Sequence, residues 1–317
     1  MTITGERSNH FQTPQKLRSA DKVAIPVLFV KEKDRPKHTE GALWDIDKKV
    51  LYGVDIIGKK VFEYSPSKEE INLLDVPEHI GTVVPTKTGE LLVALQSGLG
   101  IINPKTESFT WKVRFNNNLK IRSNDGKCSP EGRFWFGTMG YKPNDQQKEG
   151  SLYRLDPDYS LTTVLDRSVT ISNGIVWNKK GDKMFYIDTP TSEVVEYNYD
   201  SEKGTILDRR VVIKAGEIQG YFDGATIDEE DKIWIALWGG GGVGRYDPIS
   251  GKLIDFVKTP GANQVSSCSF GGNNLDELYI TTSREGLRLE DLDQQPMAGA
   301  VFKVKLPIRG LPAYKFG

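Results

Sequence analysis

The segment GDKMFYIDTPTSEVVEY (residues 181–197) has five relatives elsewhere in this chain of 317 residues. Each relative has a turn, a short run rich in Val, Ile, Tyr, Phe or Trp, a second turn and often a third run. They are KKVLYGVDIIGKKVFEY (48–64), GELLVALQSGLGIIN (89–103), GRFWFGTMGY (132–141), DKIWIALWGGGGVGRY (231–246) and DELYITTSREG (276–286). Aligning Tyr52, Leu92, Trp135, Phe185, Trp234 and Tyr279 separates the copies by 40, 43, 50, 49 and 45 residues.

These repeats predict an all-β fold. Short runs of β-branched and aromatic residues bounded by Gly, Asp, Asn or Lys are typical of strands, and no longer window has a helical period. A sheet of about four such strands cannot bury both of its faces until neighbouring copies stack against it. Six copies therefore predict a six-bladed β-propeller that occupies residues 21–317 as a single domain, with residues 1–20 as a loose polar tail.

Two further segments have a predicted place in this propeller. VAIPVLFV (23–30) belongs to no copy of its own, so we expect it beside AGAVFKVKL (298–306) as an outer strand of the last blade, where it closes the ring. LWGGGGVGRYDP (237–248) formally contains GxGxxG, but it lies between two strand-like runs instead of between a strand and a helix. It therefore predicts a hairpin turn in the fifth blade and no dinucleotide site.

Composition excludes several classes of function. Lys and Arg total 42 against 43 for Asp and Glu, without a basic stripe, which argues against nucleic acid as a partner. No secretory signal or apolar membrane span is present, so we expect a soluble protein with neither a membrane nor an obligate protein partner. Cys128 and Cys268 form no CxxC pair, and a reducing cytoplasm with both thiols buried fits them best. Three dispersed histidines and no GxSxG motif disfavour histidine-rich zinc sites and histidine-dependent triads.

Six short pieces align just before the repeated strands. They are EGALWD from Glu40, IGTVVP from Ile80, DGKCSP from Asp125, NGIVWN from Asn173, DGATID from Asp223 and SSCSFG from Ser266. The second residue is glycine in five of the six, which suits a positive φ or a crowded strand entry. Equivalent positions at the start of innermost strands surround one end of a propeller's central channel, so we expect the six first residues to face one another.

This alignment predicts a cation in the channel. Three carboxylates and two amides, with Asn124 beside Asp125, would raise one another's pKa unless a cation lay among them. Ligands that are all oxygen favour Ca²⁺ first, with Mg²⁺, Mn²⁺ or Zn²⁺ as alternatives. A metal that only fastens the blades together, or polar strand ends bonded to backbone groups, would also explain the pattern.

The acidic run YFDGATIDEED (221–231) divides under the same alignment. Asp223 belongs to the ring of aligned residues. The acids from Asp228 to Asp231 occupy the turn between the first two strands of the blade, where other copies have DIDKK, SPEG or NKKGD. Because these are turn-forming residues, we expect them to face solvent.

The chain resembles a known family. EGALWD, RSNDGKCSPEGRFWFGTMG, ISNGIVWN, YFDGATID with DKIWIA, and SFGGNNLDELYITTSREG are similar, in order, to motifs of the senescence marker protein, gluconolactonase and luciferin-regenerating enzyme family (regucalcin-like). The resemblance covers about residue 23 to the C-terminus. It implies a six-bladed propeller with a divalent metal in the channel, which agrees with the repeat count.

The resemblance also implies roles for individual residues. Glu40, Asn173 and Asp223 match the family's metal ligands, and Arg122 and Asn124 match its substrate-binding pair, with Asn124 a further metal ligand in some branches. Regucalcin-like members carry acidic residues after GTM, one of which contacts the sugar. Here Lys142 stands among the residues that follow GTM, so the substrate expected from the resemblance need not be a sugar-acid lactone.

The predicted function is the opening of an aldonolactone-like cyclic ester by a water that the metal activates. Asp223 is the first choice for general base and Asp125 the second, and Arg122 at the rim would bind the carbonyl oxygen or substrate hydroxyls. Alternatives are a hydrolase of other esters or phosphoesters on the same metal, or a regucalcin-like calcium-binding regulator without turnover. A protein-binding scaffold is a third alternative.

Overall fold

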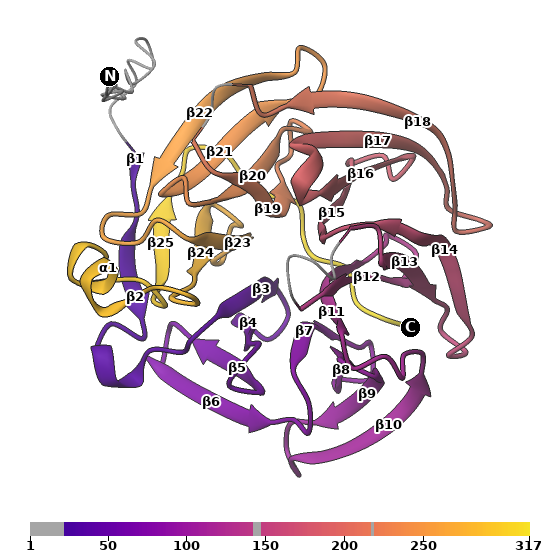
Figure 1. Cartoon of the computed structure of the whole chain (residues 1–317), viewed down its shortest axis with the longest axis horizontal. Coiled ribbons are helices and arrows are strands. Elements are labelled where there is room, and N and C mark those ends of the chain that lie inside the picture. Colours follow the sequence, from indigo (N-terminus) through magenta and orange to yellow (C-terminus); the bar gives the residue numbers. More distant parts are fainter. Residues whose placement is uncertain (1–21, 142–146, 217–218) are drawn as a thin grey trace, which may run out of the picture.

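The computed structural model describes residues 22–141, 147–216 and 219–317, so the expected tail 1–20 lies outside the described residues. Within them, six β-sheets surround one axis as the blades of a propeller (Figure 1). Helical structure is limited to α1 (Leu289–Gln294) and the 3₁₀ turns η1 (Glu32–Asp34) and η3 (Thr189–Thr191) in this part of the chain. None of these described helices has the length or the apolar character to cross a membrane. The predicted six-bladed all-β fold is confirmed.

Each blade contains an antiparallel meander of four strands whose first strand lies innermost; in the sixth blade the outer strand comes from the N-terminal region. Blades one to three comprise β3 (Thr39–Asp45), β4 (Val50–Asp55), β5 (Lys60–Ser65), β6 (Glu70–Asp75); β7 (Ile80–Pro85), β8 (Leu91–Leu95), β9 (Gly98–Asn103), β10 (Ser108–Arg114); β11 (Ile121–Cys128), β12 (Phe134–Gly140), β13 (Gly150–Leu155) and β14 (Leu161–Val169). Blades four to six comprise β15 (Ser172–Trp177), β16 (Lys183–Asp188), β17 (Glu193–Asp200), β18 (Thr205–Lys214); β19 (Tyr221–Ile227), β20 (Ile233–Trp238), β21 (Gly242–Asp247), β22 (Lys252–Lys258); β23 (Val265–Gly271), β24 (Glu277–Thr282), β25 (Val301–Lys305) and β2 (Ile25–Leu28).

The N-terminal strands close the ring. β2 pairs antiparallel with β25 and so completes the sixth blade, as the sequence predicts. The short strand β1 (Lys22–Val23) was not expected: it pairs in parallel with β22 at the outer edge of the fifth blade. The N-terminal region therefore joins the fifth and sixth blades, and it covers strand edges that would otherwise stay unpaired.

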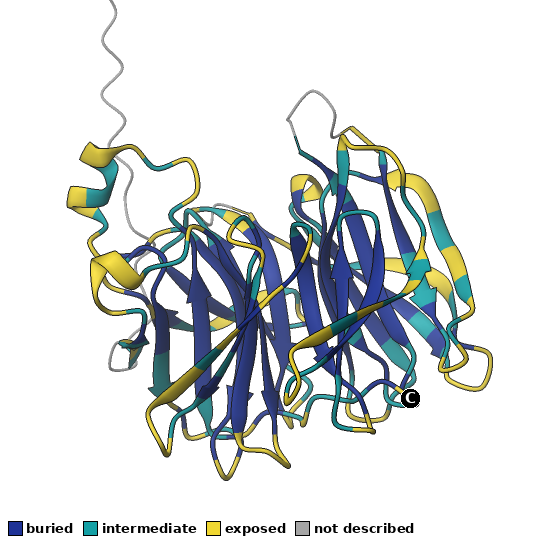
Figure 2. Cartoon of the chain, turned by 90° about the horizontal axis from the view of Figure 1, so that it is seen from below, coloured by how far each residue is buried: buried dark blue, intermediate teal, exposed yellow. Residues whose placement is uncertain are grey.

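The core lies between the blades. The six aligned aromatic and aliphatic residues of the second strands are all buried: Tyr52, Leu92, Trp135, Phe185, Trp234 and Tyr279. Burial falls from the inner strands, such as β3 and β7, which are buried throughout, to outer strands such as β10, which alternates between exposed and half-buried residues (Figure 2). This gradient follows from stacking, because inner strands are covered on both faces by neighbouring blades.

The glycine run forms the predicted hairpin. Gly239 and Gly241 have φ values of 81° and 67° in the turn that joins β20 to β21. The backbone N–H of Gly240 donates to the carbonyl oxygen of Leu237 at 2.9 Å. No helix follows the turn, so the GxGxxG spacing here is a coincidence of hairpin chemistry.

The expectation that the acids after Asp223 face solvent is wrong for Asp228. Glu229 and Glu230 are exposed, but Asp228 is completely buried. One of its carboxylate oxygens accepts from Trp234 Nε1 (2.9 Å) and Arg245 Nε (2.7 Å), and the other accepts from the backbone N–H groups of Glu230 and Lys232. Asp228 thus ties the turn to the second and third strands of its blade.

Candidate metal and active site

The inner strands carry an irregularity at the predicted site positions. Neighbouring inner strands contact one another all the way round the axis. In every one of them the pairing with the second strand of the blade shifts register near its start: between Glu40 and Leu43, Ile80 and Thr82, Ser123 and Gly126, Asn173 and Ile175, Phe222 and Ala225, and Val265 and Ser267. Such bulges release residues from the regular ladder and redirect their side chains. The predicted register of the six blades is confirmed.

Two glycines show why the second residue of the aligned pieces is so often glycine. Gly41 has a φ of +64°, a conformation that other residues rarely adopt. Gly81 has a different reason, because a Cβ atom there would lie 2.4 Å from the carbonyl oxygen of Asn124 in the neighbouring blade. The glycines therefore serve both the turn into the strand and the close approach of adjacent inner strands.

A chain of buried hydrogen bonds connects three blades at the site. Arg122 Nη1 donates to Asn124 Oδ1 at 2.7 Å, and Asn124 Nδ2 donates to Asn173 Oδ1 at 3.0 Å. Asn173 Nδ2 donates in turn to Thr189 Oγ1 at 2.7 Å, whose hydroxyl donates to the carbonyl oxygen of Phe222 at 2.8 Å. The chain ends beside Asp223, so the two predicted amide ligands are held in fixed orientations.

Three buried carboxylates complete the site. Burial is the main reason that the pKa values of Glu40, Asp125 and Asp223 all lie above their ordinary values. The pKa of Glu40 rises to about 8, with the charge of Asp125 as the next cause, and that of Asp223 rises well above its usual range, also because of Glu40 and Asp125. The predicted acids therefore act on one another electrostatically.

The residues present fit a divalent cation. In the described residues no three His, Cys, Asp or Glu side chains converge as a metal-binding group, so an ion here would also need amide oxygens. Asp125 Oδ2 is buried without a hydrogen-bond partner. Among the described residues, the amide oxygens of Asn124 and Asn173 each accept one hydrogen bond and keep a second lone pair. A cation would relieve the mutual repulsion of the acids and use these unfilled oxygen positions.

Protonation of Glu40 leads to a testable pH dependence. Its pKa in the metal-free protein is about 8, against an ordinary 4.5, so folding without metal takes up a proton between these values. The stability that this proton contributes is complete below about pH 4.5 and is lost as the pH rises through about 8. A cation replaces the proton, so we expect the calcium-induced rise in Tm to grow from pH 5 to pH 8. Thermal unfolding with calcium or chelator at each pH checks this, and a rise that is the same at both ends would contradict it.

The other predicted positions offer fewer polar groups to a ligand. Ile80 supplies an apolar side chain, and the Ser266 hydroxyl donates to the carbonyl oxygen of Thr39 at 2.7 Å. Arg122 differs from the expectation that it lies at the rim, because it is only 7% exposed and holds Asn124. Its pKa is lowered, chiefly by burial.

Sequence reasoning missed a group of side chains around Arg122. Glu285 binds buried His38, and Tyr141 OH lies 2.7 Å from Nδ1 of His79. The Tyr141 ring centre is 5.9 Å from Arg122 Cζ. A signal was available: His38 and His79 come just before the aligned residues Glu40 and Ile80, and Glu285 comes just after a repeated second strand.

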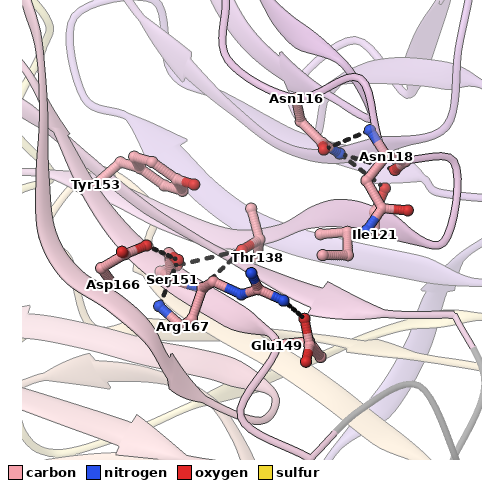
Figure 3. A pocket seen from close by; sticks show the side chains of 9 residues that line it. All are labelled: Asn116, Asn118, Ile121, Thr138, Glu149, Ser151, Tyr153, Asp166 and Arg167. Atoms are coloured by element: carbon pink, nitrogen blue, oxygen red, sulfur yellow. Dashed lines mark hydrogen bonds and ion pairs between the residues drawn. The ribbon is translucent and has the colours of Figure 1, made fainter.

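Two cavities lie elsewhere in the fold. One, of about 210 Å³, is lined by residues of the third blade and the loop before it, including Ser151, Asp166 and Arg167 (Figure 3). The other, of about 830 Å³, lies between the outer parts of the first and sixth blades and includes Phe29 and Tyr279. Neither is lined by any of the predicted site residues, so neither is the site expected from the repeats.

The family follows from comparison with known proteins. Residues 38–284 match the model of the SMP-30/Gluconolactonase/LRE-like region. The chain belongs to this family. The match spans the stretch from His38 to Arg284 and thus includes every predicted site residue.

Relatives within the family are similar over nearly their whole length. Regucalcin of Danio rerio is 35% identical over 285 residues, which cover 90% of this chain and 96% of the relative. A protein of Bacillus subtilis (strain 168) named "Putative sugar lactone lactonase YvrE" is 34% identical over 279 residues, covering 87% and 94%. The solved structure of a luciferin-regenerating enzyme superposes with a TM-score of 0.81 at 32% identity, covering 89% of this chain and 96% of that one. Family members thus include proteins named as lactonases and proteins named as regucalcin.

Proposed function

We propose that this protein is a divalent-cation-dependent hydrolase that opens a lactone, with an aldonolactone-like cyclic ester as the substrate. The observation that carries the proposal is the set of three buried carboxylates beside the fixed chain from Arg122 through Asn124 to Asn173. Membership of a family that includes gluconolactonases supports the reaction class. Such a set of residues can bind a cation, position a carbonyl group and accept a proton.

Glu40, Asn173, Asp223 and Asn124 are the proposed metal ligands, with Asp125 next to them. All are oxygen donors, which favours Ca²⁺, with Mg²⁺, Mn²⁺ and Zn²⁺ as alternatives. When bound, a divalent cation polarises the lactone carbonyl and makes nearby water more acidic. The same positive charge would favour the ionised form of Asp223, whose pKa is otherwise raised by burial and by the charges of Glu40 and Asp125.

The chain's own residues then carry the proton transfer. Asp223 is the proposed general base: it takes a proton from the water that attacks the carbonyl carbon, and it returns the proton to the ring oxygen as the carbon–oxygen bond breaks. Asp125 is the second candidate, because its Oδ2 atom is buried without a partner. Nearby Lys127 lowers the pKa of Asp125 against the larger effect of burial.

Arg122 has two proposed roles. Its guanidinium holds the Asn124 oxygen, and its remaining N–H groups can stabilise the negative charge that develops on the carbonyl oxygen. A lactone carbonyl placed between Arg122 and the acids would therefore meet a cationic donor on one side and the proposed base on the other. This explains why an arginine is placed in a buried position.

The residues after GTM bear on the substrate. Lys142, which stands where regucalcin-like members have acids, lies outside the described residues. The neighbouring Tyr141 is described, and its phenol contacts His79. The absence of an acid at position 142 leaves other esters or phosphoesters as alternative substrates of the same site.

A calcium-binding regulator is the second candidate function. The similarity to proteins named regucalcin favours it, and it requires the same ligands but no base or oxyanion donor.

Both cysteines are free and buried, which agrees with the reducing cytosol that the sequence favours.

Turnover on a substrate panel separates these functions. We expect the calcium-loaded protein to open several aldonolactones well above their spontaneous rates, and chelation to remove this activity while calcium restores it. The panel includes simple carboxylic esters and phosphoesters, assayed by proton release or chromogenic product. Calcium binding by calorimetry together with no turnover on any panel member would reject the enzyme and leave the regulator.

A further inference from the structure

Glu285 is fixed in an unusual way for a half-exposed acid. It follows β24 in the sixth blade, and one carboxylate oxygen, Oε2, is bound to Nδ1 of His38 from the segment before β3. The His38 side chain is only 8% exposed, whereas that of Glu285 is 46% exposed. The other oxygen, Oε1, has no hydrogen bond to any residue that the structure describes. A buried imidazole therefore holds an open acceptor in place.

His79 is held in a corresponding way from the second blade. Its Nδ1 atom lies 2.7 Å from Tyr141 OH, and the two rings are 5.5 Å apart. Burial raises the pKa of the phenol to about 12 and lowers that of the imidazole, so both groups are neutral near pH 7. A phenol that donates to Nδ1 leaves the proton of His79 on Nε2, where it is an available donor.

Both pairs lie near Arg122. The Tyr141 ring centre lies 5.9 Å from Arg122 Cζ, and the charge of Glu285 is the largest of the charges that raise the pKa of Arg122 against its burial. Glu285 and His79 also influence each other's pKa, which places the two pairs in range of one another. Trp238 adds an aromatic wall, with its ring 5.3 Å from that of His38.

We propose that Glu285 and His79 form a recognition rim for the ring hydroxyls of the substrate, above the position where Arg122 receives the carbonyl group. Glu285 accepts hydrogen bonds from hydroxyls, and His79 donates to a hydroxyl oxygen. His38 and Tyr141 are positioning residues that hold these two side chains. The inference rests on the proposed function for the reacting carbonyl, but the rim itself recognises hydroxyls whether or not the ring is opened.

The rim gives the protein an acid near the substrate that its sequence lacks after GTM. A carboxylate that accepts from hydroxyls forms charge-assisted hydrogen bonds, which are stronger than those between neutral groups. It also disfavours a substrate with an acidic substituent on the same side. The expected ligand is therefore a neutral, polyhydroxylated ring.

The test compares Glu285→Gln with the wild-type full chain in calcium. For D-glucono-1,5-lactone we expect kcat/KM to fall by about ten- to a hundredfold, because a hydrogen bond to a charged acceptor is lost. For δ-valerolactone, which has no hydroxyls, kcat/KM stays within twofold, as does calcium affinity. Glu290→Gln is the matched control. Glu290 is an exposed acid of α1 that pairs with Arg288, and its substitution should leave kcat/KM for both lactones unchanged.

A second probe separates the rim from the proposed reaction. 1,5-Anhydro-D-glucitol has the hydroxylated ring but no carbonyl, so its binding, measured by ligand-observed NMR titration, does not depend on turnover. We expect wild type to bind it at least about tenfold more tightly than Glu285→Gln. Tyr141→Phe, which frees His79, is expected to raise KM for gluconolactone several-fold with little change in kcat.

Three outcomes would overturn the rim. They are equal losses of Glu285→Gln on the two lactones, no loss on gluconolactone, and no difference between wild type and Glu285→Gln in binding the anhydroglucitol. A wild type that opens neither lactone but binds the anhydroglucitol through Glu285 would reject the proposed reaction and support the rim.

Discussion

Replacing Asp223 by alanine is expected to remove calcium binding and lactone turnover together. The substitution deletes a proposed ligand and the proposed base in one step, so we expect kcat/KM to fall by about a thousandfold or more. Calcium affinity measured by calorimetry should fall by at least about a hundredfold, and Glu40→Ala should have the same effect on affinity. Glu40 and Asp223 come from different blades, so equal losses would show that one ion is shared across the ring.

Unfolding cannot explain the expected loss. Burial and their mutual electrostatic effect disfavour the charged forms of Asp223 and Glu40 in the metal-free protein, so removal of either should leave the chelated protein as stable as wild type or more stable. The matched control is Glu229→Ala, an exposed acid six residues beyond Asp223, which should leave affinity and turnover unchanged. Equal losses in the Asp223 and Glu229 variants would contradict the proposed assignment of Asp223 to the metal site.

Asp228→Ala is expected to have the opposite profile, with a large loss of stability and little direct effect on the site. The substitution leaves the Arg245 guanidinium and the Trp234 indole N–H without their buried acceptor. Breaking a buried, hydrogen-bonded ion pair from one side costs about 3–5 kcal/mol of unfolding free energy. Chemical denaturation measures this loss, and calcium affinity of the folded fraction should remain near that of wild type.

The control for Asp228 uses the same arginine. Glu230 pairs with Arg245 at 2.6 Å, but its side chain is exposed. Glu230→Ala should therefore change the unfolding free energy by less than about 1 kcal/mol. A similar loss in both variants would mean that burial of Asp228 does not determine its contribution.

The repeats explain why so much of the fold and the ring could be predicted. A strand pattern that returns six times specifies the same local structure six times, so errors in a single copy do not change the register. Glu40, Asn173 and Asp223 could be aligned because each is followed by a glycine and lies near the start of a buried inner strand. The bulges that release these side chains have no comparable pattern, since they arise from pairing with the second strand.

The errors come from contacts that no local pattern contains. Asp228 lies in an acidic run that is typical of a solvated turn, and only the folded blade brings Trp234 and Arg245 to it. Arg122 is expected at the rim as a substrate-binding residue, yet it is buried and bonded to Asn124. The burial and contacts of charged side chains are thus the weakest part of a prediction from repeats.

The rim shows a related difficulty. Its two members, Glu285 and His79, and their positioning residues, His38 and Tyr141, lie just outside the strands, in segments that differ from blade to blade. Only the ring geometry shows that they meet near Arg122. The proposed specificity residues are therefore ones that repeat analysis does not align, whereas the proposed metal ligands are those it aligns best.

The rate of gluconolactone opening by chelator-treated protein, followed while free calcium is raised, tests the central claim most directly. The proposed site predicts a rate that starts at the spontaneous value, rises with calcium to saturation, and corresponds to one ion per chain. A rate that stays at the spontaneous value at every calcium concentration, or one above it that does not respond to the metal, would contradict a metal-dependent lactonase.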